Sequence, residues 1–230
     1  MRRPSKFFLL TALLVFAWQS GLWAQDNSTA PPAPYKATTE IKSPKRWDDS
    51  DKRVELLYFF WYGCPTCAMI DEQVSEMVKT LPAQIRFQRL PAAFNENEDW
   101  QSHARLFWAL QNLGQEEKLH SAVFQAVQPG GPMGGHGPLQ LLSPESQKAF
   151  ARANKIDPAE FENSLKSPLT YNMMQKTMDY LNAIDLVYVP SFIVNGKYNV
   201  TIEPRRPITD FIKEAEKLTL EELIKAVEAQ

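Results

Sequence analysis

The sequence predicts an α/β fold, in which a central mixed sheet is flanked by helices and carries an inserted helical domain. Residues 53–96 show a strand, a helix and a second strand, and residues 185–230 show a strand hairpin followed by helix. Between them, residues 97–184 carry helical patterns. The two flanking segments therefore form the first and second halves of one sheet domain, and the middle segment is its insert.

The N-terminus, residues 1–24, has the composition of a secretory signal peptide. The basic residues Arg2 and Arg3 precede an apolar run at 7–18, and the segment closes on the small residue Ala24. A retained membrane anchor is the alternative, but the run is about a dozen residues long and a span needs about 20. We therefore expect cleavage after Ala24 and export of the mature chain to an oxidising compartment.

Residues 25–52 are rich in Pro, Ser, Thr, Asp and Lys, a composition typical of a flexible leader. Within this leader, residues 35–41 fit a short edge strand. The net charge of the whole chain is -2, which points neither to nucleic acid nor to an anionic membrane surface as a partner.

The first half of the sheet domain opens with residues 54–62, an aliphatic and aromatic run long enough for one buried central strand. A helix follows from Cys64, and residues 84–90 form the next strand. We expect Asp71 and Glu72 to lie on the solvated face of this helix. Its apolar residues recur at spacings of three and four, namely Met69, Ile70, Val74, Met77 and Val78.

The insert and the second half are divided by clear start and stop signals. Asn97 can cap the first helix of the insert, which Gly114 ends. Residues 189–201 form two strands joined at Asn195-Gly196, the strongest short hairpin signal. One or two amphipathic helices follow, and Thr219 with Glu222 can cap the last. Three other helix starts pair a capping oxygen with proline, at Ser143-Pro144, Asp157-Pro158 and Ser167-Pro168.

The chain has only two cysteines, Cys64 and Cys67. A structural disulfide is one interpretation, but a pair three residues apart closes a small loop and removes little entropy from the unfolded chain. Half of a zinc site is another, but His103, His120 and His136 lie outside any ligand spacing, so we expect no metal. The run Cys-Pro-Thr-Cys at a strand–helix junction favours redox chemistry instead.

The position of the pair predicts unequal thiols. Cys64 lies at a helix N-terminus, where unpaired N–H groups and the helix dipole favour negative charge. Such sites bring thiol pKa values to roughly 3.5–7.5, so Cys64 should be the attacking thiolate. Pro65 suits the first helical turn, which needs no N–H there. Cys67, one turn inside and less exposed, would resolve the mixed disulfide.

Two separated runs carry a resemblance to a known family. The run FFWYGCPTC at 59–67, followed by VPSFIVNGKY at 189–198, resembles the periplasmic DsbA-type thiol–disulfide oxidases. These proteins have a thioredoxin fold with a helical insertion. The resemblance covers residues 53–200 in order, and it implies the same fold, the same activity and a periplasmic location for this chain.

The resemblance also implies roles for single residues. Cys64 would be the nucleophile that forms the mixed disulfide with substrate, and Cys67 would be the resolving thiol. Pro190 would be a cis-proline beside the cysteines, and Val189 would offer its backbone to an extended substrate peptide. From the residues alone, the favoured interpretation of Pro190 is a proline at the start of a strand, in the far commoner trans form, and the resemblance reverses that preference.

The sequence departs from the family at two positions that tune the pair. Thr66 stands where well-known members have histidine, whose positive charge can stabilise the Cys64 thiolate, so we expect a less oxidising disulfide. Tyr58 stands where many members bury an acid that accepts a proton. Glu55 lies on the opposite face of the same strand by its period-two alternation and is no obvious substitute. Water or the Tyr58 hydroxyl would then exchange the proton of Cys67.

The expected function is that of an oxidase that donates its Cys64–Cys67 disulfide to unfolded or partly folded secreted proteins. A quinone-linked membrane partner, like DsbB, would reoxidise it; no other cofactor and no nucleic acid is expected, and the protein would be a monomer. A reductase or isomerase on the same fold remains an alternative. So does a non-enzymatic peptide-binding or metallochaperone module.

Overall fold

The computed structural model describes residues 37–94, 97–128, 130, 140–203 and 205–229. The predicted signal peptide at 1–24, the start of the leader and His136 lie outside the described residues. The strands are β1 (Thr38–Glu40), β2 (Val54–Phe60), β3 (Ile85–Pro91), β4 (Ser191–Val194) and β5 (Tyr198–Thr201). The helices are α1 (Pro65–Thr80), α2 (Glu98–Asn112), α3 (Glu116–Val127), α4 (Pro144–Ala153), α5 (Pro158–Leu165), α6 (Pro168–Ala183) and α7 (Ile208–Glu228).

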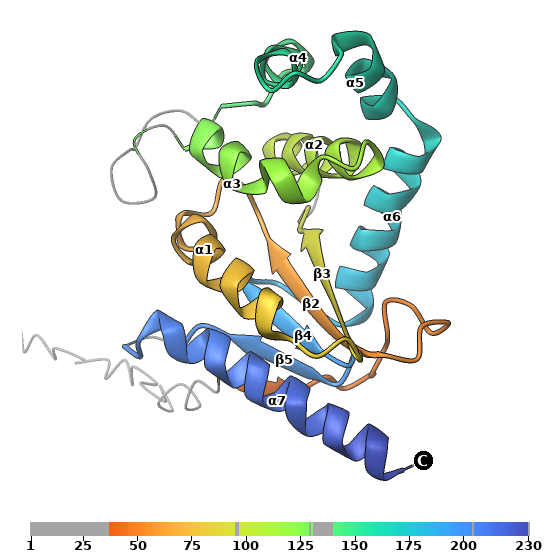
Figure 1. Ribbon diagram of the computed structural model, residues 1–230, viewed down its shortest axis with the longest axis vertical. Helices are drawn as coiled ribbons and strands as arrows, with labels where there is room; N and C mark the ends of the chain where they lie inside the picture. The colour runs from red at the N-terminus through yellow and green to blue at the C-terminus, as the bar shows by residue number, and fades with distance from the viewer. Residues whose placement is uncertain (1–36, 95–96, 129, 131–139, 204, 230) are drawn as a thin grey trace, which may run out of the picture. The chain divides into compact units, whose positions relative to one another are not determined.

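The strands form one mixed sheet in the order β1-β5-β4-β2-β3, which confirms the predicted α/β class (Figure 1). Only β2 and β3 are parallel; β4 runs antiparallel to β2, with Leu56 opposite Val194. Every residue of β2 is buried. A strand that is buried on both faces has a nearly continuous apolar sequence. Residues 54–60 therefore lack the alternation of apolar and polar residues that a half-exposed strand shows.

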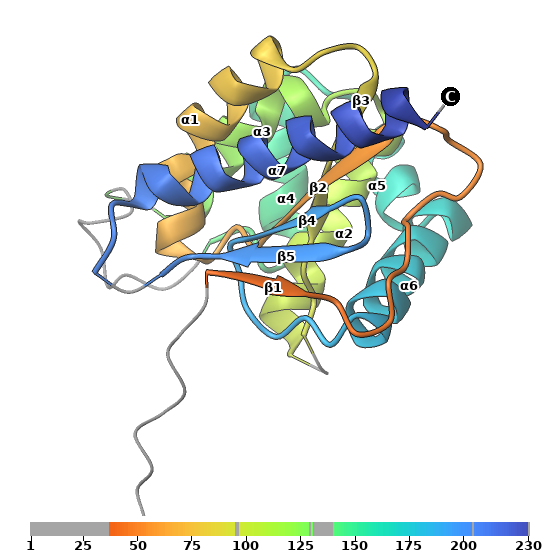
Figure 2. The same cartoon turned by 90° about the horizontal axis from the view of Figure 1, so that it is seen from below.

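Helices α1 and α7 cover one face of the sheet, and α6 lies against the other (Figure 1 and Figure 2). Neighbouring residues of β2 point to opposite faces. The Tyr58 ring contacts Phe192 of β4, which contacts Phe211 of α7, with ring centroids 4.9 and 4.8 Å apart. On the opposite face, Phe59 stacks on Tyr180 of α6 at 6.0 Å. Aromatic side chains of β2 thus connect both helical layers.

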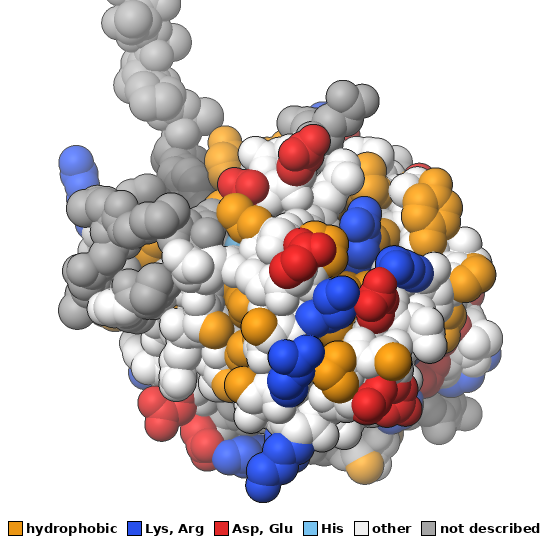
Figure 3. All heavy atoms as spheres, turned by 90° about the horizontal axis from the view of Figure 1, so that it is seen from above, with side chains coloured by type: hydrophobic (Ala, Val, Ile, Leu, Met, Phe, Trp, Pro, Cys, Tyr) orange, Lys and Arg blue, Asp and Glu red, His pale blue; other side chains and the backbone are white. Residues whose placement is uncertain are grey.

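Helices α2–α6 lie between β3 and β4 in the chain, where the sequence predicts the insert. The predicted caps are present: the side chains of Ser143, Asp157 and Ser167 each accept a backbone N–H from the helix that follows, and proline opens that helix. Lys148 of α4 pairs with Glu162 of α5 at 3.1 Å. The face in Figure 3, seen from the side of these helices, mixes acidic, basic and apolar side chains.

The hairpin between β4 and β5 turns at Asn195 and Gly196, as the sequence predicts. Their φ angles are 49° and 67°, so both residues are left-handed, which two-residue hairpins require. A Cβ on Gly196 would lie 2.3 Å from the carbonyl oxygen of Lys45. The Lys45 N–H also donates to the Gly196 carbonyl at 3.1 Å. The turn therefore holds the segment before β2 against the sheet.

The described part of the leader differs from the flexible segment that its polar composition predicts. β1, inside the range 35–41, pairs antiparallel with β5 at the edge of the sheet. Trp47 is buried, and the N–H groups of Trp47 and Asp48 each donate to the buried Glu55 carboxylate at 3.0 Å. A buried carboxylate needs such partners, and composition alone does not reveal them.

The C-terminal helix also differs from its prediction in one respect. Helix α7 continues through Thr219 without a break, because the Thr219 hydroxyl donates to the Ala215 carbonyl within the helix and does not cap a new one. Glu222 is buried and accepts hydrogen bonds from Asn195 and Lys197. These bonds hold α7 against the β4–β5 hairpin.

We predict that Gly196→Ala destabilises the protein more than Gly114→Ala, measured as the free energy of unfolding in urea. Both glycines have positive φ, which costs an alanine about 1–2 kcal/mol. Gly114 has no atom within 4 Å of its would-be Cβ, whereas Gly196 has the Lys45 carbonyl at 2.3 Å. We expect Gly196→Ala to lose at least about 1 kcal/mol more, as strained sites do. Equal losses would contradict the close approach.

Candidate active site

Cys64 caps the N-terminus of α1. Its backbone is extended, Pro65 occupies the first turn, and its sulfur accepts the Cys67 N–H at 3.2 Å. Both cysteines are free thiols. Cys64 is 9% exposed and Cys67 is fully buried. The strand–helix junction therefore presents one sulfur toward the surface and keeps the other beneath it.

The environment lowers the pKa of the Cys64 thiol. The largest cause is a hydrogen bond from the Cys67 thiol, and the backbone N–H groups of Cys67 and Thr66 act in the same direction. Burial opposes them, since it disfavours the charged form. The direction is the one that the helix N-terminus predicts, but the neighbouring thiol contributes more than the backbone.

The environment of Cys67 has the opposite effect and raises the pKa of its thiol. Burial raises the pKa of Cys67 well above that of an ordinary thiol, and the hydrogen bond to Cys64 raises it further. The Tyr58 hydroxyl interacts with Cys67 and acts in the opposite, lowering direction. This hydroxyl is buried and has no hydrogen-bond partner among the described residues. At neutral pH, Cys67 is therefore the protonated member of the pair.

The structure brings Val189 and Pro190 to the cysteines, 125 residues along the chain from Cys64. The Val189–Pro190 peptide bond is cis, as the family resemblance implies. The Cys64 thiol donates to the Val189 carbonyl oxygen at 3.9 Å. The pairing of β4 with β2 produces this contact, since Ser191 lies opposite Phe59 just before the cysteine loop.

The two tuning positions lie on different sides of the pair. Thr66 is half-buried, and only its backbone N–H acts on Cys64. Tyr58 is fully buried, and its hydroxyl interacts with Cys67. Glu55 points to the other face of β2. There its carboxylate accepts the N–H groups of Trp47 and Asp48, and its Oε2 lies 3.7 Å from Arg46 Nε. Glu55 therefore lies away from the cysteines, as its place in the strand predicts.

One acidic residue near the pair has been missed by sequence reasoning. Asp71 is buried, so its predicted place on a solvated face is wrong, while its neighbour Glu72 is exposed as expected. Helix α3 covers Asp71: the Ser121 hydroxyl donates to its carboxylate at 2.5 Å, and His120 Nε2 lies 3.3 Å away. The signal in the sequence is its spacing of four from Cys67, which places both on one helix face.

Several large apolar side chains lie close in the chain to Cys64 or to its contact Val189. Trp61, just before the pair, stacks on Trp100 of α2 with ring centroids 4.1 Å apart. Val187 and Tyr188 precede Val189 and are among the most exposed large apolar residues of the described chain. Met69 of α1 is exposed as well.

In the ranges that the structure describes, no cluster of three or more His, Cys, Asp or Glu side chains is arranged to hold a metal ion. Within those same ranges, no helix is long and apolar enough to cross a membrane.

Comparisons with known proteins agree on one family. The family model described as thioredoxin matches residues 49–228. The thiol:disulfide interchange protein DsbA of Pseudomonas aeruginosa is 31% identical over 216 residues, which cover 91% of this chain and 96% of that protein. DsbA of Burkholderia cepacia is 31% identical over 84% of this chain and 86% of its own length.

Solved structures agree with the sequences. The crystal structure of Pseudomonas aeruginosa DsbA superposes with a TM-score of 0.73 at 29% identity, covering 83% of this chain and 94% of that one. The oxidoreductase DsbA of Xylella fastidiosa, at 24% identity and a TM-score of 0.72, shares the fold over 81% of this chain and 95% of that chain. The chain therefore belongs to the thioredoxin family, and within it the protein is a DsbA-type thiol:disulfide oxidoreductase.

Proposed function

We propose that this protein is an oxidase that donates a disulfide between Cys64 and Cys67 to unfolded or partly folded secreted proteins. The observation that carries the proposal is the opposite tuning of the two thiols, since the pKa of Cys64 is lowered and that of Cys67 is raised. A pair tuned in this way favours its reduced form with one thiolate, so its disulfide readily accepts electrons.

The chemistry runs in two exchanges. A substrate thiolate attacks the Cys64 sulfur, the Cys64–Cys67 bond breaks, and Cys67 leaves and takes up a proton because its pKa is raised. The substrate is then held to Cys64 by a mixed disulfide. A second substrate thiolate attacks the substrate sulfur of that bond, and Cys64 leaves as its stabilised thiolate. Two electrons pass from the substrate to the pair.

Substrate binding follows from the surroundings of Cys64. The Val189 backbone next to the cis peptide bond of Pro190 offers hydrogen-bonding groups to an extended peptide, as in strand addition. The exposed side chains of Val187, Tyr188 and Met69 supply apolar contacts that do not depend on one sequence. Such a surface suits partly folded chains that expose apolar residues.

Each turnover leaves the pair as a dithiol, so a second protein must remove two electrons. A quinone-linked membrane reoxidant of the DsbB type fits this need, and the pair itself is the only redox group that the proposal uses. The N-terminal sequence supports export and cleavage after Ala24. The enzyme would therefore work in the periplasm, as a monomer.

The opposite direction, reduction or isomerisation, is the second candidate, and Thr66 favours it. Threonine adds no positive charge beside Cys64, and only the Thr66 backbone acts on the thiolate. Thiol trapping in living cells separates the two. A pair held mostly as disulfide supports the oxidase, whereas a pair held mostly as dithiol supports the reductase or isomerase.

We predict that Cys64→Ser abolishes oxidation of a reduced, unfolded secreted protein, because no sulfur remains to form the mixed disulfide. Cys67→Ser, first converted by oxidised glutathione to a mixed disulfide at Cys64, should exchange with a substrate thiolate, release glutathione and hold the substrate at Cys64, because no Cys67 thiol remains to release it. Non-reducing electrophoresis with mass spectrometry reads both outcomes. If Cys64→Ser keeps its activity, or if the mixed disulfide forms on Cys67, the assigned roles are wrong.

We also predict that Thr66→His makes the disulfide more oxidising, measured by its equilibrium with reduced and oxidised glutathione. A protonated imidazole beside the Cys64 thiolate stabilises the reduced form. We expect the equilibrium to shift by about tenfold, since one pKa unit corresponds to about 1.4 kcal/mol. Thr66→Ser is the matched control and should leave it unchanged. An unchanged equilibrium in Thr66→His would show that this position does not tune the pair.

A further inference from the structure

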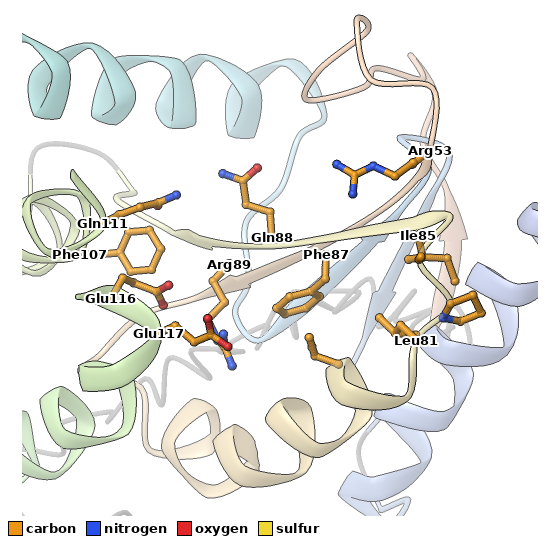
Figure 4. Close-up of a pocket in the computed structure, with 13 residues that line it drawn as sticks. Arg53, Leu81, Ile85, Phe87, Gln88, Arg89, Phe107, Gln111, Glu116 and Glu117 are labelled. Atoms are coloured by element: carbon orange, nitrogen blue, oxygen red, sulfur yellow. The ribbon is translucent and has the colours of Figure 1, made fainter. Parts of the chain in front are cut away.

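Helix α3 of the insert lies alongside α1 and runs in the opposite direction. At its start, Glu116 lines a cavity of about 460 Å³ that the last turn of α1 and strand β3 also line (Figure 4). Further along, the Ser121 hydroxyl donates to Asp71 in the second turn of α1. At its end, the Gln128 side chain reaches Tyr62, just before the cysteines. The insert therefore contacts the segment that leads into the reactive pair.

Tyr62 is fully buried, and α3 holds it at two points. Its hydroxyl lies 2.9 Å from Nδ1 of His120. Its backbone carbonyl accepts the side-chain amide of Gln128 at 2.7 Å. Its ring packs edge-on against Phe60 and Phe124, with ring centroids 5.0 and 4.9 Å apart. The side chain and the backbone of Tyr62 are thus both fixed by the insert.

The bond between the Tyr62 hydroxyl and His120 joins two neutral groups. Burial raises the pKa of Tyr62 well above its ordinary value, so the hydroxyl keeps its proton. Burial, together with the charge of Arg89, lowers the pKa of His120 well below its ordinary value. A neutral ring has one nitrogen that accepts, so the Tyr62 hydroxyl can donate to Nδ1. Nε2 then carries the ring proton and lies 3.3 Å from the Asp71 carboxylate.

Tyr62 and Gly63 are the central residues of a tight turn that leads into Cys64. The Cys64 N–H donates to the Trp61 carbonyl at 2.9 Å and closes this turn of four residues. Turns of types I and II differ in the direction of the peptide bond between the two central residues. Type II needs a positive φ at the third residue, which a glycine adopts readily. Gly63 has no such φ here, so the turn is held in the other form.

The amide of Gln128 acts on this central peptide bond. The carbonyl that accepts it belongs to Tyr62 and therefore to the peptide that joins Tyr62 to Gly63. Reversal of that peptide would turn the carbonyl away from Gln128 and break the hydrogen bond. A half-buried amide that loses its acceptor is destabilised, so Gln128 favours the observed form of the turn.

The turn determines where the Cys64 sulfur lies, because Cys64 is its fourth residue. From there the sulfur accepts the Cys67 N–H at 3.2 Å, and the thiol meets the Val189 carbonyl at 3.9 Å. Reversal of the central peptide would change the direction in which the backbone enters α1. Hydrogen bonds weaken steeply with misalignment, so the sulfur would lose part of the bonding that lowers its pKa.

We propose that Gln128 and Tyr62 are positioning residues for Cys64, through which helix α3 holds the turn before α1 in one form. In that form, the Cys64 sulfur faces the hydrogen-bond donors at the start of α1. Both residues act through the backbone of the turn and take no part in the exchange of bonds. The insert thus contributes to the reactivity of the pair. The inference rests on the proposed role of Cys64 as the nucleophile.

The test compares variants by the pKa of Cys64 and by the equilibrium of the disulfide with reduced and oxidised glutathione. The pKa is taken from the rate of Cys64 alkylation across pH, with the modified cysteine identified by mass spectrometry. Gln128→Ala removes the amide, and Gln128→Met removes the donor while it keeps the length of the side chain. Tyr62→Phe removes the hydroxyl alone. Gln125→Ala removes an amide from the exposed face of α3 and is the matched control.

We expect Gln128→Ala and Gln128→Met to raise the pKa of Cys64, because the released turn aligns its sulfur less well with the donors. The equilibrium with glutathione should shift about threefold or more toward the enzyme disulfide, within the roughly 2- to 12-fold that one net hydrogen bond supports. Tyr62→Phe should shift both quantities in the same direction by a smaller factor, since Gln128 still holds the carbonyl. Gln125→Ala should match the unaltered protein.

A merely structural role of Gln128 gives a different result. It would lower the stability of the reduced and oxidised forms alike, seen in urea unfolding, and leave the pKa of Cys64 and the equilibrium unchanged. Values for Gln128→Met that coincide with those of Gln125→Ala therefore overturn the inference, even where stability falls. Failure of the proposed function is distinct, because the unaltered protein would then form no mixed disulfide at Cys64.

Discussion

The hydrogen bonds that the Cys64 sulfur accepts at the N-terminus of α1 are the interaction on which the chemistry depends. The donors are the Cys67 thiol and the backbone N–H groups of Cys67 and Thr66. They can act because Cys64 is the N-cap of α1, with Pro65 in the first turn, so that its sulfur faces the N–H groups of that turn. Cys67 lies in the same turn and is fully buried, and burial raises the pKa of its thiol so that it holds a proton. One geometric constraint thus produces both halves of an unequal pair.

The sheet supplies the second participant. Strand β4 pairs with β2 in a register that sets Ser191 opposite Phe59, and this register brings the Val189 carbonyl to the Cys64 sulfur. Glu222 on α7 bonds to Asn195 in the turn that follows β4, so the C-terminal helix supports that register from one face. The inserted helices contribute differently, because α3 provides the polar side chains that face the buried side of α1. The Cys64 sulfur thus contacts the segment before β4, while the helix that Cys64 caps contacts α3.

Local patterns predicted most of this architecture. The central strand, the caps at Asn97, Ser143, Asp157 and Ser167 and the Asn195-Gly196 turn follow from rules that act within a few residues, and the structure contains them. The buried position of Asp71 could not be predicted in this way, because the residues that cover it, His120 and Ser121, lie on a helix far along the chain. The ordered segment around Trp47 escaped prediction for the same reason, since its partners lie on the sheet. A single sequence shows which side chains are polar, but only the packed fold shows which of these polar side chains are buried.

The most direct test of the account is the pKa of each cysteine in the reduced protein, measured by NMR titration of ¹³C-labelled cysteine Cβ atoms. The account predicts that Cys64 titrates below an ordinary thiol and Cys67 well above it. Cys67→Ala should raise the Cys64 value, because the Cys67 thiol is the largest cause that lowers it. Two thiols that titrate together at the ordinary value, or a lower value for Cys67 than for Cys64, would contradict the account.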